Sequence, residues 1–207
     1  RRSSDLAPAL AEAARTVGSP QIRNAGTLGG NLATCSPAGD GLPVLSALGA
    51  RVHLAGRGGE RILTVGEFML GVKRTALQPG EIITSVTIPV VDGWQGYAKV
   101  GVRNAMVIAV AAVCVVVDRT TESVAIALGS VGPTVLRAPD AERFAASRID
   151  LATLGLSDDA LRQIPDLVAS AARPITDHRS TAEYRSHAVG VLARRLLQRA
   201  GRTEGPR

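Results

Sequence analysis

The sequence predicts an α+β fold in two consecutive parts. Up to about residue 91, short helical patterns alternate with a β-hairpin and a single strand. After that point three strand patterns follow one another, and the remainder of the chain has helical periodicity. No stretch of 18 or more apolar residues occurs, so we expect no membrane span.

Composition narrows the classes of function. The chain has 207 residues, 45% of them hydrophobic, which suffices for one large domain or two small ones. Its net charge of +6 could attract an acidic partner. However, aromatic residues make up only 2% of the chain, too few to stack the bases of a single strand, so we expect no nucleic acid. Cys35 and Cys114 are too few for a disulfide framework and favour a reducing cytoplasm.

The positive charge comes mostly from arginine and is denser towards the end of the chain. We expect these arginines to occupy the solvated face of a final helix, opposite its apolar face. They are Arg185, Arg194, Arg195, Arg199, Arg202 and Arg207.

The first part begins with a helix expected over 4–17, where apolar residues recur at helical spacing. Ser4 can cap its start, and Pro8 falls in the first turns, where a missing N–H matters least. Gly18 to Pro20 should end it, and a glycine-rich segment that contains a Gly-Gly loop follows over 26–41.

After this loop, Thr64 to Glu67 matches a capping box and predicts a short helix carrying Phe68, Met69 and Leu70. Pro79-Gly80 predicts a turn. The other elements expected here are a short helix over 42–48, hairpin strands over 51–55 and 61–65, and a strand over 82–88.

In the second part, three β-rich runs predict an antiparallel meander, with a turn at 118–121 between the last two. A second capping box, Ser180 to Glu183, should begin the last helix, and Asp177 with Arg179 can tie the preceding loop to it. The domains are expected over 1–91 and 92–207. The strands are expected over 97–103, 107–117 and 123–130, and the helices over 140–146, 157–172 and 180–200.

The residues most suited to a ligand surround a pair of glycines, Gly29 and Gly30. Adjacent glycines let backbone N–H groups converge into an anion-binding nest. Thr27 adds a hydroxyl and Asn31 an amide, both suited to phosphate or ribose. A plain tight turn is the alternative that these residues leave open. The segment is neither a Rossmann fingerprint nor a Walker loop.

Residues 21–40 resemble the second FAD-binding stretch of the xanthine dehydrogenase and carbon monoxide dehydrogenase flavoproteins. That stretch is here Ile22-Arg23-Asn24-Ala25-Gly26-Thr27-Leu28-Gly29-Gly30-Asn31-Leu32, followed by Ser36-Pro37-Ala38-Gly39-Asp40. Further resemblances are Pro79 to Ile83, Tyr97 to Val100, Gly129 to Thr134 and Asp177 to Arg185. The resemblance therefore extends over nearly the whole chain.

The resemblance implies a vanillyl-alcohol-oxidase-like FAD-binding domain followed by a small domain with a three-stranded antiparallel sheet and helices. It implies that FAD phosphates lie along Gly26, Thr27, Leu28, Gly29, Gly30 and Asn31, with Thr34 nearby. Asp40 would contact a ribose or adenine-side hydroxyl, Ile83 would form an apolar wall, and Lys99 would lie near the isoalloxazine. Without the resemblance, Lys99 is expected to be an exposed strand lysine.

The same resemblance implies two partners, a molybdopterin-binding large subunit and an iron–sulfur small subunit. Electrons would pass from their centres through FAD to NAD⁺, a quinone or O₂. The alternative is a non-catalytic scaffold that bridges these subunits without flavin. No iron–sulfur or other metal pattern and no catalytic residue is expected in this chain.

Two features depart from the family pattern. The family's first Gly-Gly loop has no counterpart here, and the chain starts at Arg1, so we expect the N-terminal part of the subunit to be missing. Around Met106 and Val107 the family often has an aromatic or acidic residue facing the flavin, whereas this chain is apolar.

Overall fold

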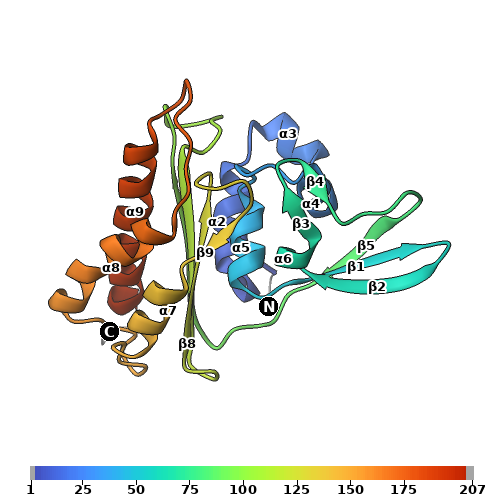
Figure 1. Ribbon diagram of the computed structural model, residues 1–207. Helices are drawn as coiled ribbons and strands as arrows, with labels where there is room; N and C mark the ends of the chain where they lie inside the picture. Colours follow the sequence, from blue (N-terminus) through green and yellow to red (C-terminus); the bar gives the residue numbers. More distant parts are fainter. Residues whose placement is uncertain (1–2, 204–207) are drawn as a thin grey trace.

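A computed structural model describes residues 3–203 of the chain, with side chains over 5–202 (Figure 1). Arg1, Arg207 and the cap expected from Ser4 lie outside the described part. The elements are α1 (Ser3–Leu6), α2 (Pro8–Thr16), α3 (Pro20–Ala25), α4 (Leu28–Thr34), α5 (Gly41–Ala47), β1 (Arg51–Gly56), β2 (Gly59–Thr64), α6 (Val65–Phe68), β3 (Met69–Gly71), β4 (Arg74–Thr75), β5 (Ile82–Thr87), β6 (Gly93–Val100), β7 (Ala111–Asp118), β8 (Ser123–Gly129), β9 (Leu136–Arg137), α7 (Pro139–Ala146), α8 (Asp158–Ala171) and α9 (Ala182–Thr203).

The larger sheet is antiparallel, in the order β6-β7-β8-β9, and is covered on both faces. Helices α7, α8 and α9 lie on one face, while α2 and α5 from the first part of the chain lie on the other (Figure 1). Side chains alternate along β7, as they must in a strand. Val113 and Val115 pack towards α8 and α9, whereas Cys114 and Val116 pack towards α2 and α5. The two parts of the chain therefore share this sheet.

The smaller sheet has the order β2-β1-β5 and projects away from the larger one (Figure 1). The hairpin of β1 and β2 forms where it was expected. Arg61 on β2 makes two hydrogen bonds to the Glu81 carboxylate before β5, at 2.8 and 2.7 Å. The Thr64–Glu67 capping box is confirmed, because each residue's side chain accepts from the backbone N–H of the other.

Three expectations about the first part were wrong in detail. The helix expected over 4–17 is two helices, since Ala7 leaves the helical region and Pro8 starts α2 anew. The Gly-Gly loop expected within 26–41 is instead part of α4, and α3 precedes it with Ser19 as its cap and Pro20 at its first position. Proline is well suited to that position, so Ser19-Pro20 marks a helix start rather than only a stop.

The strands also differ from expectation. Helix α6 ends at Phe68, and Met69 begins a small β3–β4 hairpin instead of continuing the helix. The second strand of the larger sheet starts at Ala111 and not at 107, because residues 101–110 form a loop with positive φ at Met106. The three expected strands are present, and the short β9 pairs with β8 as a fourth.

The start of α9 also corrects two expectations. Its first turn is capped by Thr181, whose hydroxyl accepts from the Tyr184 N–H at 3.2 Å, so Ser180 forms no capping box. Arg185 does not lie on the solvated face but is 4% exposed and donates to the carbonyls of Val110 and Ser130. None of the helices in the described range 3–203 combines the length and apolarity that a membrane crossing requires.

Candidate functional site

The glycine pair lies in the first turn of a helix and not in an open nest. Thr27 is the N-cap of α4, and its hydroxyl accepts from the Gly30 N–H at 2.9 Å. The other N–H groups at this helix start have no partner within the helix, as in any first turn. The backbone N–H groups and the Thr27 hydroxyl expected from the sequence are therefore present, but they are arranged as the N-terminus of a helix.

The two glycines are not equivalent. A Cβ on Gly30 would lie 3.0 Å from Thr27 Oγ1 and would disturb the cap. A Cβ on Gly29 would meet only Ile83, at 4.0 Å, which is ordinary contact. The protein's own packing therefore leaves room for a methyl group at Gly29. This contact also places Ile83 of β5 beside the start of α4.

A hollow of about 630 Å³ opens in front of this helix start. Its walls come from α2, α3 and α4, with Gly26, Thr27, Leu28, Gly30, Asn31 and Thr34 among the lining residues. The Thr34 hydroxyl is already used within the helix, where it donates to the Gly30 carbonyl at 2.8 Å. The N–H groups of Gly26, Gly30 and Asn31 are likewise used within the protein, by Ile22 O, Thr27 Oγ1 and Thr27 O.

Asn31, which lines this hollow, has a buried and unsatisfied side-chain acceptor. Its side-chain oxygen is shielded from solvent and has no hydrogen-bond partner among the residues that the structure describes. A Cβ on Gly41 would lie 2.7 Å from this oxygen, so the glycine leaves it space. Because an unpaired buried acceptor is unfavourable, a ligand hydroxyl at this position would be stabilising. This is the group that a ribose or ribityl chain offers.

Asp40 and Lys99 are brought together, although the sequence assigned them to different ends of the cofactor. Lys99 Nζ lies 2.8 Å from Asp40 Oδ2, and both side chains are 9% exposed. The expectation of an exposed strand lysine is therefore wrong. Tyr97, which the sequence did not single out, donates its hydroxyl to Asp40 Oδ1 at 2.7 Å. Tyr97 and Lys99 are two apart on β6 and so face the same side, a signal that strand alternation could have provided.

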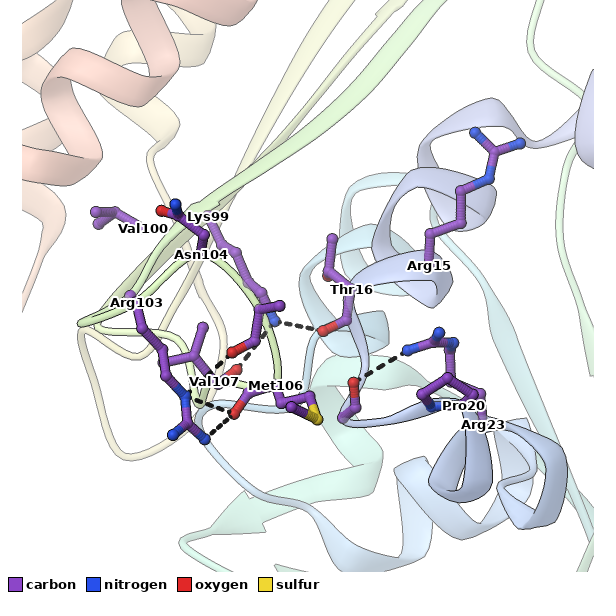
Figure 2. Close-up of a pocket in the computed structure, with 13 residues that line it drawn as sticks. Arg15, Thr16, Pro20, Arg23, Lys99, Val100, Arg103, Asn104, Met106 and Val107 are labelled. Atoms are coloured by element: carbon purple, nitrogen blue, oxygen red, sulfur yellow. Dashed lines mark hydrogen bonds between the residues drawn. The ribbon is translucent and has the colours of Figure 1, made fainter.

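A second hollow, of about 610 Å³, adjoins the first and shares Arg23 with it (Figure 2). The loop over 101–107 forms one wall and the region between α2 and α3 the other. Figure 2 shows the Arg103 guanidinium turned back on its own loop, where it donates to the carbonyls of Ala105 and Met106. Arg15 points away from the loop, so these arginines do not converge on one point.

The residues present fit an extended dinucleotide. The first hollow combines the N-terminus of α4, at the glycine pair, with an apolar side from Leu10 and Val17. The unsatisfied Asn31 oxygen supplies an acceptor between these two regions. Pockets for such ligands are mostly apolar with a few placed polar groups.

Comparison with known families matches both parts of the chain. Residues 1–91 match the family described as FAD binding domain in molybdopterin dehydrogenase. Residues 97–200 match the CO dehydrogenase flavoprotein C-terminal domain.

Curated relatives give the same result. The glyceraldehyde dehydrogenase medium chain of Sulfolobus acidocaldarius is 32% identical over 194 residues, which covers 92% of this chain and 67% of the relative. The nicotine 6-hydroxylase medium subunit of Paenarthrobacter nicotinovorans is 35% identical over 197 residues, covering 94% of this chain and 67% of the relative. The chain thus spans about two thirds of the length of these relatives.

Solved structures confirm the fold. A chain of the reconstituted CO dehydrogenase from Oligotropha carboxidovorans superposes with a TM-score of 0.84 at 32% identity. The match covers 96% of this chain and 69% of that one. The quinoline 2-oxidoreductase from Pseudomonas putida 86 has a TM-score of 0.85 at 22% identity, which supports the fold alone. This chain therefore belongs to the FAD-binding medium subunits of the molybdenum hydroxylases, a family of oxidoreductase subunits that includes the CO dehydrogenase medium chain.

Proposed function

We propose that this chain holds FAD in a molybdenum hydroxylase and relays electrons from iron–sulfur clusters of a small subunit to an external acceptor. A molybdopterin-binding large subunit would supply those electrons. The related carbon monoxide dehydrogenase medium chain of Afipia carboxidovorans is 32% identical to this chain, which supports the assignment to such a complex. A cytoplasmic location, inferred from the low cysteine content, is part of the same proposal.

The residues around the first hollow would each hold a different part of the cofactor. Gly26, Thr27, Leu28, Gly29 and Gly30 would face the phosphates through the start of α4. Asn31 would accept a hydrogen bond from a ligand hydroxyl through its unpaired oxygen. Thr34 would lie beside the phosphates, and Ile83 would form an apolar wall.

Asp40 and Lys99 would act on the flavin end as a pair. Because they already form an ion pair with each other, neither presents a full isolated charge to a ligand. We therefore assign them to shaping the wall of the site more than to binding a single cofactor group. Bound FAD supplies the redox chemistry, exchanging electrons with one-electron and two-electron partners.

The observation that carries this proposal is the unpaired side-chain oxygen of Asn31, a residue that follows the glycine pair and lines a hollow large enough for a ligand. A chain that only bridged partner subunits would have no need of an unsatisfied acceptor there. Substituting Asn31 should therefore reduce cofactor loading more than it reduces folding.

The test uses the full-length subunit purified together with its partner subunits. We expect a flavin absorbance band with about one flavin per subunit, which bleaches when the complex is given its hydroxylation substrate anaerobically. Asn31→Leu, which is similar in volume but apolar, should lower the flavin content and leave the complex assembled. A complex that assembles without any flavin would support the scaffold alternative instead.

A further inference from the structure

The Lys99 ammonium joins three segments that are distant in sequence. It donates to the carbonyl of Thr16 at the end of α2, to the carboxylate of Asp40 before α5, and to the carbonyl of Val107 in the loop after β6, at 2.9, 2.8 and 3.3 Å. Figure 2 shows it reaching across the gap between the loop and α2. All three of its hydrogens therefore have acceptors within the protein.

Tyr97 fixes the acceptor at the centre of this arrangement. Its side chain is buried, with the residue 4% exposed, and its hydroxyl donates to the Asp40 oxygen that Lys99 does not use. Burial, and then the charge of Asp40, raise the pKa of Tyr97 well above its usual range, so the hydroxyl stays a donor. Asp40 is thus held from two sides.

The loop over 101–109 is connected to the first part of the protein by this arrangement and by the buried side chain of Ala109. Among the described residues, Lys99 provides the hydrogen-bonded connection between this loop and the first part of the protein. It donates to the carbonyl of Val107 in the loop and to the carbonyl of Thr16 at the end of α2. Arg103 bonds only to carbonyls of the loop itself. Gly101 packs against Val107, because a Cβ there would lie 2.5 Å from the valine side chain.

We propose that Tyr97, Asp40 and Lys99, here called the Lys99 cluster, hold the 101–109 loop against α2 and so set the width of the second hollow. Tyr97 is a positioning residue in this cluster, acting through Asp40 on Lys99. The proposal deepens the proposed function, since it assigns the cluster to the wall beside the flavin. The role of the cluster in holding the loop rests on hydrogen bonds within the protein and does not require bound flavin.

The first test exploits the fact that the chain has two lysines, Lys73 and Lys99. An amine-acylating reagent, the N-hydroxysuccinimide ester of acetate, is applied to the full-length complex and labelling is followed by mass spectrometry. Exposed Lys73 should label fast and Lys99 slowly. Tyr97→Phe, which keeps the buried ring, should raise the Lys99 rate about fivefold, the factor expected for one average hydrogen bond.

The second test follows the loop by hydrogen–deuterium exchange. Lys99→Met should speed exchange of the amides over 101–109 by about tenfold or more, since charge-assisted hydrogen bonds are lost. Lys73→Met is the matched control and should leave the loop unchanged. Loop exchange within twofold of the wild type in both Lys99→Met and Tyr97→Phe would overturn the proposal, and Tyr97→Phe decides it if Lys99→Met fails to fold.

A third measurement separates positioning from simple packing. In the flavin-loaded complex, Lys99→Met leaves the charge of the Asp40 carboxylate without its cationic partner and should lower the flavin reduction potential. The double variant Lys99→Met/Asp40→Asn removes both charges and should return the potential towards wild type while the loop stays loose. If the flavin reduction potential instead changes in parallel with the exchange rate of the loop amides in both variants, the positioning role of the cluster is contradicted. If the complex carries no flavin, the proposed function fails, but labelling and exchange still decide the cluster.

Discussion

At the scale of single residues, the two adjacent glycines give a test that separates cofactor contact from folding. We expect Gly29→Ala to reduce flavin content in the full-length complex, because a methyl group there meets only Ile83 within the protein, at 4.0 Å, and projects beside the proposed phosphate position. Gly30→Val should abolish flavin loading. It is less informative, since a Cβ at that position already crowds the Thr27 cap.

The measurement is the ratio of flavin to protein absorbance, with thermal unfolding as the check on folding. Gly58→Ala in the β1–β2 turn is the matched control, because a Cβ there meets nothing within 4 Å. Normal flavin content in Gly29→Ala would remove this turn from the cofactor site.

The residues of the candidate site could be predicted from the sequence, but which of them contact one another could not. The segment around Gly29 and Gly30 was found because its motif is long and specific. The pairing of Asp40 with Lys99 was not, since residues 59 apart in sequence meet only through tertiary packing, in which α5 lies against β7 and β8. Tyr97 was missed for the same reason, although its spacing from Lys99 placed both on one strand face.

At the scale of elements, local signals predicted what local interactions decide. The Thr64–Glu67 capping box and the β1–β2 hairpin form as expected, because their hydrogen bonds lie within a few residues. The Gly29–Gly30 pair was expected to lie in a loop, yet α4 forms there although glycine disfavours helices. The buried side chain of Leu32 packs into the core around β1 and α6, and this tertiary contact outweighs the propensity.

The hydrogen bonds between Arg61 on β2 and Glu81 before β5 predict that the stability of the protein depends on pH in the acidic range. Hydrogen bonds from Arg61, then from the Gln78 N–H, lower the pKa of Glu81 from 4.5 to about 2. A carboxyl with a lowered pKa in the folded state contributes stability above about pH 4.5, and this is lost as the pH falls towards 2. We expect the melting temperature to fall over this window in the wild type.

The check is circular dichroism melting at pH 5 and pH 2.5. Glu81→Gln should be less stable than the wild type at pH 5, with a smaller drop between the two pH values. An exposed carboxylate, Asp159 on α8, provides the control substitution Asp159→Asn. An equal drop in Glu81→Gln and wild type would show that this pair does not contribute to acid sensitivity.

At the scale of the whole molecule, α2 belongs to the first part of the chain but packs on the sheet of the second. Glu12 on α2 accepts from Arg199 on α9 at 2.8 Å and from the Tyr97 N–H on β6 at 2.7 Å. Arg199 also lies over the Trp94 ring, 5.0 Å from its centroid. The boundary near residue 92 therefore separates two sequence families, but not two independent cores.

This packing predicts that both parts unfold together and that Glu12→Ala destabilises both. We expect a loss of about 1–3 kcal/mol, mainly because the Tyr97 N–H loses its acceptor. Urea unfolding followed by Trp94 fluorescence and by circular dichroism should give coincident transitions in wild type and variant. Glu60→Ala in the exposed β1–β2 hairpin is the control. Separate transitions for the two probes would mean that the parts fold independently.

The last prediction concerns how much of the cofactor site these 207 residues contain. The chain covers 67% of the Sulfolobus acidocaldarius medium chain, and the family resemblance implies a further glycine loop that has no counterpart in residues 1–207. Residues 1–207 alone should therefore bind FAD much more weakly than the full-length subunit. Each phosphate hydrogen bond lost weakens binding by roughly 1.5–3 kcal/mol, so two or three such bonds shift the dissociation constant by several orders of magnitude.

Titration calorimetry of both proteins with FAD measures this difference directly. Circular dichroism of the shorter protein must first show a folded chain, since an unfolded one would bind weakly for another reason. If folded residues 1–207 bind FAD with a micromolar or lower dissociation constant, the start of α4, Asn31 and the residues around them suffice for the cofactor. The family's first Gly-Gly loop would then contribute little to affinity, and the two halves of the phosphate site would be unequal.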